Sequence, residues 1–252
     1  MTKIDTTETV PKKNFYIDLL PNIEALNIML ANQLEGFEAV KKAINSISIC
    51  VDKVERLLSK NKKNKLIYVG AGTSARIAVQ DGVELYPTFG WPRHRVKFII
   101  AGGKKALTRS VEGAEDLRDK KIDEVVKNFI QPNDVVIGLA ASGTTKFTVE
   151  IIKYANKIGA LTIGITNNVN TKLEKYSQIP IVLNTGTEIV AGSTRLKAGT
   201  SQKICLNLIS TLVMARLGRV KNGLMNNMVV SNKKLLLRKK KIDFLLSQNK
   251  RD

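Results

Sequence analysis

The chain has 252 residues, of which 43% are hydrophobic, so it is long enough to bury one α/β core with helical additions. Its formal net charge is +19, but the basic residues are dispersed and only 5% of the chain is aromatic. Without aromatic residues interleaved with the basic clusters, the composition argues against nucleic acid as a partner. The first residues are polar and no apolar run is long enough to span a bilayer, so we expect a cytoplasmic protein that makes no membrane contact.

Residues 1–58 are expected to form an N-terminal arm followed by helices. The arm, residues 1–16, lacks periodicity and is expected to order only against another surface. Apolar residues then recur at helical spacing in two stretches, residues 22–30 and 37–58, which predicts a helical layer.

Residues 59–219 are expected to form the central domain. Short β-branched runs predict five strands that are buried on both faces, at residues 66–69, 96–101, 135–140, 161–166 and 179–183. Helical segments between them predict an α/β fold, a three-layer α-β-α sandwich around a five-stranded parallel sheet. The last long helix of the domain is expected to follow residues 192–203, and residues 220–252 are expected to form a basic helical tail.

Two glycine- and hydroxyl-rich turns follow predicted strands, at residues 70–75 and 140–145. Glycines let the backbone approach an anion, hydroxyls add donors, and the following helix contributes N–H groups and a partial positive charge. Neither turn has the spacing of a nucleotide-binding fingerprint, and no acidic residue ends a second strand to hold a ribose. The pair therefore predicts a phosphate site that suits a monophosphate better than a nucleotide.

Few side chains are available for acid–base chemistry. His94 is the only histidine and lies between arginines in a predicted loop, so an exposed histidine is the favoured interpretation. Cys50 and Cys205 lie in apolar helical patterns, which indicates buried thiols rather than a disulfide or a metal pair. Glu84 and Glu115 follow the first and second predicted strands, but spacing alone favours a helix-surface role for each.

Six motifs in order carry a resemblance to a known family. They lie at residues 68–76, 81–90, 101–103, 111–116, 138–143 and 188–203. In this order they resemble the N-acetylmuramic acid 6-phosphate etherases of the sugar isomerase (SIS) superfamily, whose domain is flavodoxin-like. The resemblance implies a lyase of peptidoglycan recycling that forms N-acetylglucosamine 6-phosphate and D-lactate by elimination and then hydration. It implies no metal or other cofactor, a phosphosugar as the small-molecule partner, and a homodimer.

The resemblance also assigns roles by position. Glu84 matches the proton donor to the lactyl oxygen, and Glu115 the second glutamate, a candidate for proton chemistry at C2; which of them acts as acid or base at each step stays open. Residues matching the phosphate cradle are Gly72, Thr73, Ser74, Ser142, Gly143, Thr144 and Thr145. Residues matching the segment that closes over the sugar are Glu188, Ser193 and Lys197, together with Thr200. For Ser193, Lys197 and Thr200, a helix-capping or surface role is an equal alternative.

Two other functions compete with the etherase. A non-catalytic SIS sensor, similar to the glucokinase regulatory protein, would keep the phosphate turns and lose an acid or a base. Because both Glu84 and Glu115 are present, the enzyme is favoured. An aldose-ketose isomerase also needs a base at C2, and the motif at residues 111–116, which resembles the etherases, argues against it.

Overall fold

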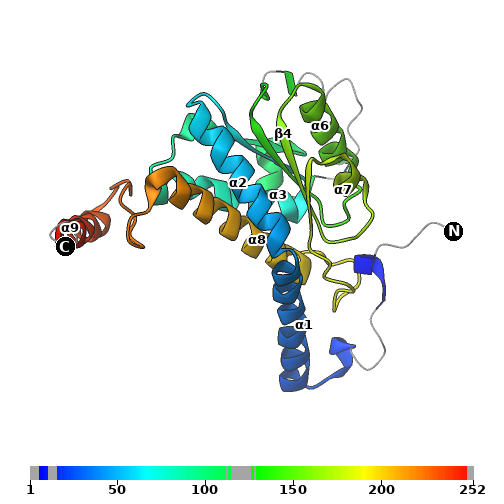
Figure 1. Cartoon of the computed structure of the whole chain (residues 1–252). Coiled ribbons are helices and arrows are strands. Elements are labelled where there is room, and N and C mark those ends of the chain that lie inside the picture. Colours follow the sequence, from blue (N-terminus) through cyan, green and yellow to red (C-terminus); the bar gives the residue numbers. More distant parts are fainter. Residues whose placement is uncertain (1–5, 11–15, 112, 115–125, 128, 249–252) are drawn as a thin grey trace.

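A parallel sheet of five strands, in the order β2-β1-β3-β4-β5, forms the centre of the protein (Figure 1). It is seen in a computed structural model that describes residues 6–10, 16–111, 113–114, 126–127 and 129–248. The strands are β1 Leu66–Gly70, β2 Val96–Ile100, β3 Val135–Leu139, β4 Leu161–Thr166 and β5 Ile179–Val182. The predicted strands are confirmed with their boundaries shifted by at most one residue, and so is the α/β class.

Helices cover both faces of this sheet (Figure 1). The α-helices are α1 Asn22–Lys42, α2 Ile44–Lys60, α3 Gly72–Val83, α4 Leu85–Phe89, α6 Lys146–Lys157, α7 Lys172–Tyr176, α8 Lys197–Met214 and α9 Lys233–Gln248. Shorter turns are η1 Thr6–Glu8, η3 Ile17–Leu19, η4 Arg93–Arg95, η5 Gly103–Leu107 and the π-helical η7 Ala215–Arg219. In the described part of the chain, no helix combines the length and the apolar character needed to cross a membrane.

Strand β1 illustrates why the sheet is buried on both faces. Leu66 and Tyr68 belong to the core shared with α1, α2, α3 and α8, whereas Ile67 and Val69 belong to the core shared with α6 and α7. Successive side chains of a strand point to opposite faces, so a run of consecutive apolar residues serves both layers. The two cysteines are buried thiols, as predicted, and burial raises the pKa of Cys50 to about 12.

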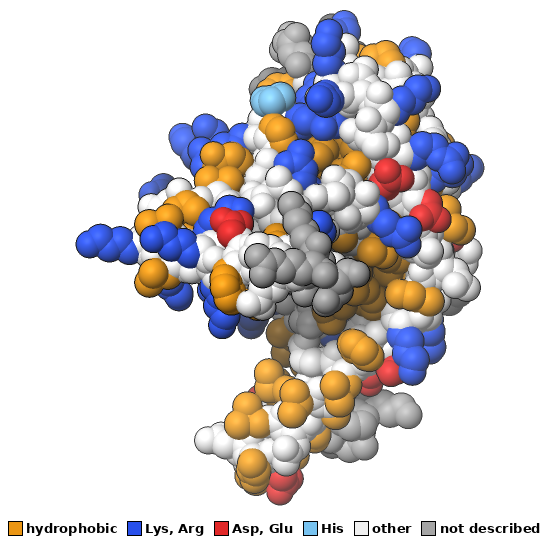
Figure 2. All heavy atoms as spheres, turned by 60° about the vertical axis from the view of Figure 1, so that its left-hand side comes forward, with side chains coloured by type: hydrophobic (Ala, Val, Ile, Leu, Met, Phe, Trp, Pro, Cys, Tyr) orange, Lys and Arg blue, Asp and Glu red, His pale blue; other side chains and the backbone are white. Residues whose placement is uncertain are grey.

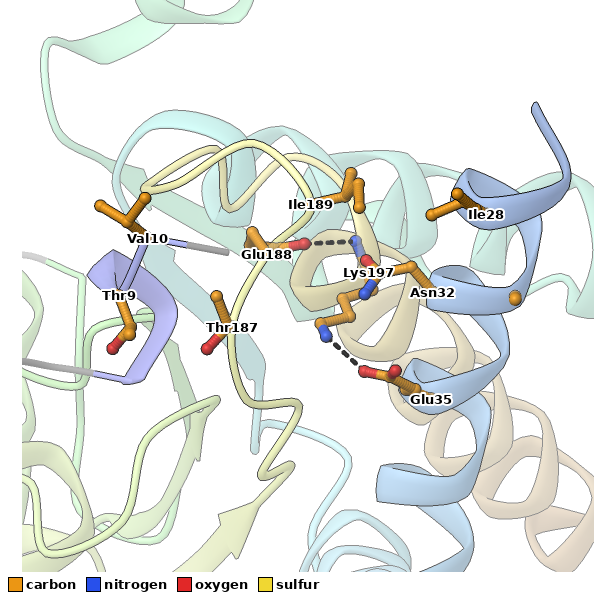
Figure 3. A pocket seen from close by; sticks show the side chains of 10 residues that line it. Thr9, Val10, Ile28, Asn32, Glu35, Thr187, Glu188, Ile189 and Lys197 are labelled. Carbon is orange, nitrogen blue, oxygen red and sulfur yellow. Dashed lines mark hydrogen bonds and ion pairs between the residues drawn. The ribbon is translucent and has the colours of Figure 1, made fainter. Parts of the chain in front are cut away.

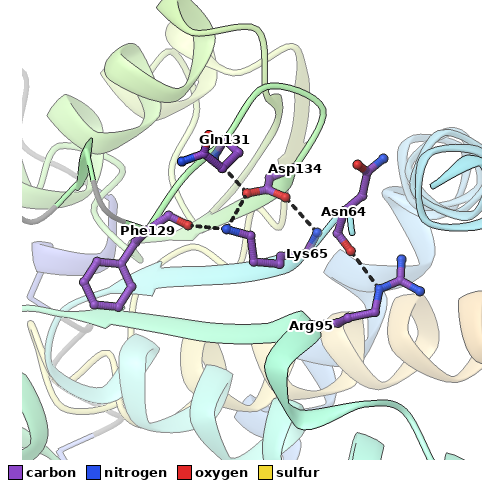
Figure 4. Close-up of polar contacts among 6 residues, drawn as sticks. All are labelled: Asn64, Lys65, Arg95, Phe129, Gln131 and Asp134. Carbon is purple, nitrogen blue, oxygen red and sulfur yellow. Dashed lines mark hydrogen bonds and ion pairs between the residues drawn. The ribbon is translucent and has the colours of Figure 1, made fainter. Parts of the chain in front are cut away.

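A buried acidic residue fixes the edge where β1 and β3 begin (Figure 4). The Asp134 carboxylate accepts hydrogen bonds from the backbone N–H groups of Lys65 at 2.7 Å and Gln131 at 2.8 Å, and lies 3.2 Å from the Lys65 ammonium. Nearby, the Arg95 guanidinium donates to the Asn64 carbonyl at 2.8 Å. His94, beside Arg95, is exposed as predicted. These contacts lie at the edge of the sheet opposite the two glycine-rich turns. They stabilise the sheet and involve no residue of those turns.

Helix α1 differs from the prediction. We expected an interruption between residues 30 and 37, but α1 runs unbroken to Lys42 and the break with α2 falls at Ala43. Position 36, inside this helix, is a glycine because α8 passes too close to leave room for a side chain. A Cβ atom at Gly36 would lie only 2.9 Å from the Lys197 carbonyl oxygen.

The outer half of α1 extends away from the sheet and carries an apolar stripe (Figures 1 and 2). Ile23, Leu26, Leu30, Leu34 and Phe37 recur at helical spacing, and each is more than half exposed. Isolated exposed apolar residues are common in soluble proteins, but a contiguous row of them marks an interaction surface. We call these five residues the α1 stripe.

One further expectation needs correction. Helix α8 begins at Lys197 rather than after residue 203, because the Glu188 carboxylate supplies acceptors for its first N–H groups. The described part of the arm packs against another surface, as expected, and that surface belongs to the same chain. Thr7 is fully buried against the same chain. The predicted tail helix is present as α9, with most of its side chains exposed.

Candidate active site

The first glycine-rich turn connects β1 to α3. Gly72 starts the helix with φ of +53°, a conformation that glycine adopts readily. Thr73 is half-buried and Ser74 is buried, so the turn is packed rather than loose. A Cβ atom at Gly70 would lie 3.2 Å from both the Ala75 nitrogen and the Leu139 carbonyl oxygen, which explains the glycine at the end of β1.

The second turn connects β3 to α6. Gly143 has φ of +68°, and a Cβ atom there would lie 2.5 Å from the Thr166 hydroxyl and also overlap Thr171. The Ser142 hydroxyl accepts the backbone N–H of Thr144 at 3.2 Å and lies 3.4 Å from the Thr145 hydroxyl. Gly143 is therefore required by both conformation and space, and the hydroxyl groups of this turn form one cluster.

Both turns end at helix N-termini that have no side-chain cap. Ala71 precedes α3 and Thr145 precedes α6, and neither side chain accepts a hydrogen bond from its helix. The first N–H groups of a helix lack intrahelical partners and carry a partial positive charge, which suits a bound phosphate. Since β1 and β3 are neighbours, with Gly70 beside Leu139, the two turns lie side by side. The structure thus brings together the seven predicted cradle residues.

The carboxyl end of β4 is fixed by the N-terminal arm. Asn168 donates to the Ala141 carbonyl at 3.0 Å and to the Thr7 hydroxyl at 3.1 Å, and accepts from the Thr6 hydroxyl at 2.7 Å. The Thr7 carbonyl accepts the Gly192 N–H at 3.0 Å. Residues more than 160 positions apart are therefore joined beside the second turn.

Two charged residues predicted to close over the sugar meet at the start of α8, where Lys197 is the first residue of the helix and Glu188 lies in the loop before it (Figure 3). The Glu188 carboxylate is fully buried and accepts the N–H groups of Lys197 at 3.3 Å and Ala198 at 2.9 Å. Burial raises its pKa, although these hydrogen bonds oppose the shift. The buried Lys197 ammonium pairs at 2.5 Å with Glu35 of α1, which is 60% exposed. Glu188 thus anchors α8, and Lys197 joins α8 to α1.

The first turn of α8 also approaches the first glycine-rich turn. A Cβ atom at Gly199 would lie 3.5 Å from the Thr73 side chain. The Thr200 hydroxyl donates to Gln33 of α1 at 2.7 Å, which supports its packing role. Ser193 is half-buried in the loop before α8, where its N–H donates to the Val190 carbonyl at 2.9 Å.

Glu84 lies apart from this group. It is exposed and follows the last residue of α3, the helix whose first residue is Gly72 of the first turn. At about 1.5 Å per residue, the twelve residues of α3 separate Glu84 from that turn by about 18 Å. Glu115 lies outside the described residues. Within one chain, the structure does not place Glu84 beside the phosphate turns.

A buried polar cluster holds the end of α3 that carries Glu84. The Asp81 carboxylate accepts from Tyr68 at 3.2 Å, Asn207 at 2.8 Å and Ser210 at 3.2 Å. The Lys203 ammonium lies 3.8 Å away. Burial raises the Asp81 pKa, while the hydrogen bonds and Lys203 oppose the shift. Since the Glu84 N–H donates to the Asp81 carbonyl, this cluster sets the direction in which Glu84 leaves α3.

Comparisons with known proteins identify the family. Residues 49–156 match the N-terminal SIS domain of the glucokinase regulatory protein, and residues 108–212 match the SIS domain. The N-acetylmuramic acid 6-phosphate etherase of Clostridium beijerinckii is 41% identical over 94% of this chain and 77% of its own length. This chain belongs to the N-acetylmuramic acid 6-phosphate etherase family. The corresponding etherase of Lactococcus lactis is 40% identical over 94% of this chain and 79% of its own.

Solved structures support the fold of this etherase family member. A putative phosphosugar isomerase from Bacteroides fragilis has a TM-score of 0.58 at 19% identity, covering 81% of this chain and 95% of its own. At that identity the likeness concerns the fold alone. The family and the SIS fold inferred from the six motifs are therefore confirmed.

Sequence reasoning missed several buried polar residues of this candidate site. Asn167 donates to Ser201 at 2.9 Å and accepts from Gln202 at 2.9 Å, and Asn168 holds the arm. A usable signal was present, because two asparagines directly follow a buried strand at the edge where ligands gather. No comparable signal marks Thr7, whose role depends on contacts far away in the sequence.

Proposed function

We propose that this protein cleaves the lactyl ether of N-acetylmuramic acid 6-phosphate, giving N-acetylglucosamine 6-phosphate and D-lactate in peptidoglycan recycling. The observation that carries the proposal is 41% identity over 94% of the chain to an enzyme of that name. The two uncapped helix N-termini at adjacent turns agree with a phosphosugar substrate. We further propose that the protein acts in the cytoplasm and that residues 59–219 form its SIS domain.

The reaction needs an acid and a base. Opening of the sugar ring exposes an aldehyde at C1, which acidifies the hydrogen at C2. A base removes that proton, the bond between C3 and the lactyl oxygen breaks, and an acid protonates the departing oxygen. Water then adds its hydroxyl group to C3 and a proton returns to C2. We assign the proton donor to Glu84, which can afterwards deprotonate the water, and we assign proton transfer at C2 to Glu115.

The phosphate is assigned to the two turns. The backbone N–H groups at the starts of α3 and α6, with the hydroxyls of Ser74, Ser142 and Thr145, supply the donors, while Gly72 and Gly143 let the two turns adopt positive φ. Thr73 lies between Gly72 and Ser74 in the first turn, and Thr144 lies between Gly143 and Thr145 in the second. Anchoring the non-reacting phosphate holds the sugar at a fixed distance from the acid and the base, which lowers the entropic cost of reaction.

We propose that the enzyme is a homodimer in which each phosphate cradle uses Glu84 of the partner subunit. Two observations support this arrangement. Glu84 is exposed about 18 Å from the cradle of its own chain, because α3 separates them. The α1 stripe, in turn, is an unpartnered apolar surface on a helix that also contacts Lys197. In a dimer with twofold symmetry, both features would occur twice, giving two equivalent sites.

The decisive experiment follows lactate release from N-acetylmuramic acid 6-phosphate in water enriched in ¹⁸O. We expect D-lactate release and one heavy oxygen atom at C3 of the sugar product, because C3 gains its hydroxyl group from water. Direct cleavage between the lactyl carbon and oxygen would leave C3 unlabelled and contradict the mechanism. Tight phosphosugar binding without lactate release would favour the sensor, and aldose-ketose exchange would favour the isomerase.

A further inference from the structure

One face of α3 runs from the first glycine-rich turn to the proposed acid. Thr73, Ile77, Gln80 and Glu84 recur at spacings of four, three and four residues, which places them on the same side of the helix. Glu84 keeps helical backbone angles as the C-terminal cap of α3, so the periodicity extends to it. Gln80 and Glu84 are exposed, whereas the two residues nearer the turn are half-buried. This face therefore connects the phosphate end of α3 to the end that carries the carboxylate.

Helix α8 lies beside α3 (Figure 1) and carries a cation along it. A Cβ atom at Gly199 would lie 3.3 Å from the Ile77 side chain. Four residues later, on the same side of α8, the Lys203 ammonium lies 3.8 Å from the Asp81 carboxylate. Since Asp81 is three residues before Glu84, Lys203 reaches the turn of α3 that immediately precedes the acid.

Lys203 is only loosely held in this position. Its side chain is 31% exposed, and a separation of 3.8 Å is too long for a hydrogen bond. The Asp81 carboxylate already accepts hydrogen bonds from Tyr68, Asn207 and Ser210. Within the described part of the chain, no oxygen accepts a hydrogen bond from Lys203. Its ammonium group therefore keeps donors for an anion that arrives from solvent.

The other cation at this end of α3 lies on a different side. The Arg93 guanidinium stacks on the Tyr86 ring at 4.1 Å and borders a cavity that Gly82 also lines. Gly82 is about 200° around the helix from Glu84, because successive residues are about 100° apart. Arg93 is therefore on the far side of α3 from the acid, and Lys203 is the better candidate to meet an anion there.

The proposed substrate supplies such an anion. Its phosphate is assigned to the cradle, and its other charged group is the lactyl carboxylate. That carboxylate is bonded to the same carbon as the ether oxygen that Glu84 is proposed to protonate. A cation one helical turn from Glu84 can thus pair with the carboxylate while the acid serves the oxygen.

We infer that Lys203 binds the lactyl carboxylate of the substrate, from the same subunit that supplies Glu84. The inference rests on the proposed function, because it assigns the group that receives one part of that substrate. It makes Lys203 a specificity-determining residue. The charged pair is lost when the lactyl carboxyl group is blocked as an amide, so the enzyme should distinguish the free acid from the amide.

The test compares cleavage of N-acetylmuramic acid 6-phosphate with cleavage of its lactyl carboxamide, a neutral analogue of nearly the same size. Both give N-acetylglucosamine 6-phosphate, and its formation gives kcat/KM for each substrate. The unmodified protein should favour the acid by about tenfold or more, because hydrogen bonds between charged groups are stronger than those to neutral groups. Lys203→Gln should lower kcat/KM for the acid about 10- to 100-fold and change it little for the amide. Lys203→Arg keeps the charge and should retain most of the preference.

Glutamine at position 203 keeps a donor for Asp81, which protects the fold, and circular dichroism checks it. The matched control is Lys53→Gln, the same change at an exposed position of α2, which should leave both rates unchanged. Equal losses on the two substrates in Lys203→Gln would show that Lys203 acts only through Asp81 and would overturn the inference. An unmodified protein that cleaves the amide as well as the acid would overturn it without any variant.

The same assays separate this inference from the proposed function. If the unmodified protein cleaves the acid and Lys203→Gln keeps the full preference, only the assignment of Lys203 is wrong. If the unmodified protein forms no product from either substrate, both proposals are contradicted.

Discussion

The two ends of α3 differ in how much of the site a single chain builds. At its first residue, Gly72, the helix joins a packed turn beside a second turn of the same kind, and neighbouring segments secure both. At its other end, Glu84 is exposed to solvent, although Asp81 fixes the backbone beneath it. The turn at the first end of α3 is completed by segments of the same chain, whereas the Glu84 carboxylate at the other end is exposed to solvent.

This difference has a physical basis. A phosphate site can be made from backbone N–H groups, which local sequence places at the carboxyl ends of adjacent strands. An acid that meets the same sugar must lie several ångströms from the phosphate, and a rigid helix keeps Glu84 about 18 Å from its own turn. From this difference we propose that binding and acid catalysis are contributed by different subunits, and the following predictions test that division.

The largest expected effect comes from mixing two inactive variants. Glu84→Gln should lower lactate release by about 10²- to 10⁴-fold, because it removes the proton donor. A cradle variant with Ser142→Ala and Thr145→Ala should also be nearly inactive. Mixed dimers of the two should regain about a quarter of normal activity, since half the dimers form with one intact site each.

The mixture is measured by D-lactate release after the two variants have been unfolded and refolded together, with separately refolded samples as controls. Recovery requires that Glu84 and the cradle of one site come from different chains. A rate no greater than the average of the two separate variants would show that each chain supplies its own acid, and it would contradict the shared site.

The second prediction concerns the surface that joins the subunits. Leu30→Glu places a charge in the middle of the α1 stripe and should weaken dimerisation about 100-fold, because a buried unpaired charge is costly. Sedimentation at several protein concentrations measures the effect, and activity should fall with the fraction of dimer. Glu24→Lys, at an exposed position about 120° around the same helix from the centre of the stripe, should leave the dimer unchanged. A dimer unaffected by Leu30→Glu would place the interface elsewhere.

The third prediction concerns the cradle itself. Gly143→Ala should destabilise the protein by about 2 to 3 kcal/mol, because it combines a positive φ with overlap against Thr166 and Thr171. Gly186→Ala is matched in φ, +68°, but a Cβ atom there has no neighbour within 4 Å, so the cost should be about 1 kcal/mol. Urea unfolding gives both values. Equal losses would mean that close packing of the second turn adds nothing.

The smallest effect is a change in pH dependence at the start of α8. Burial raises the pKa of Glu188 above its ordinary value of 4.5, so the folded state takes up a proton more readily than the unfolded state. The stability that this group contributes is therefore present at low pH and is lost as pH rises through the raised pKa. Glu188→Gln lacks this titration.

Thermal unfolding between pH 4 and pH 8 measures this change for Glu188→Gln. Relative to the unmodified protein, the variant should gain stability as the pH rises above about 4.5. Glu24→Gln, which alters an exposed residue, is the control and should follow the unmodified protein. A stability difference that stays constant across the series would contradict the prediction for Glu188.

The strands were predictable because burial on both faces leaves a local signature. Leu66 to Val69 and Val135 to Leu139 are consecutive apolar residues, and each run ends at a glycine- and hydroxyl-rich turn. Helix α1 was less predictable. Its Gly36 resembles an interruption in the sequence, but it lies mid-helix because α8 approaches its backbone closely.

The sequence by itself determined the parallel sheet, the two glycine-rich turns and the family, since each depends on short motifs whose meaning is local. Only the tertiary structure decided that Glu188 caps α8 and that Thr7 closes the edge beside Asn168. It also separated Glu84 from the cradle of its own chain. The reason is physical: the Thr7–Asn168 hydrogen bond joins residues 161 positions apart, and Glu188 meets α8 only because the intervening loop folds back on the helix, so both contacts depend on packing that no local pattern records.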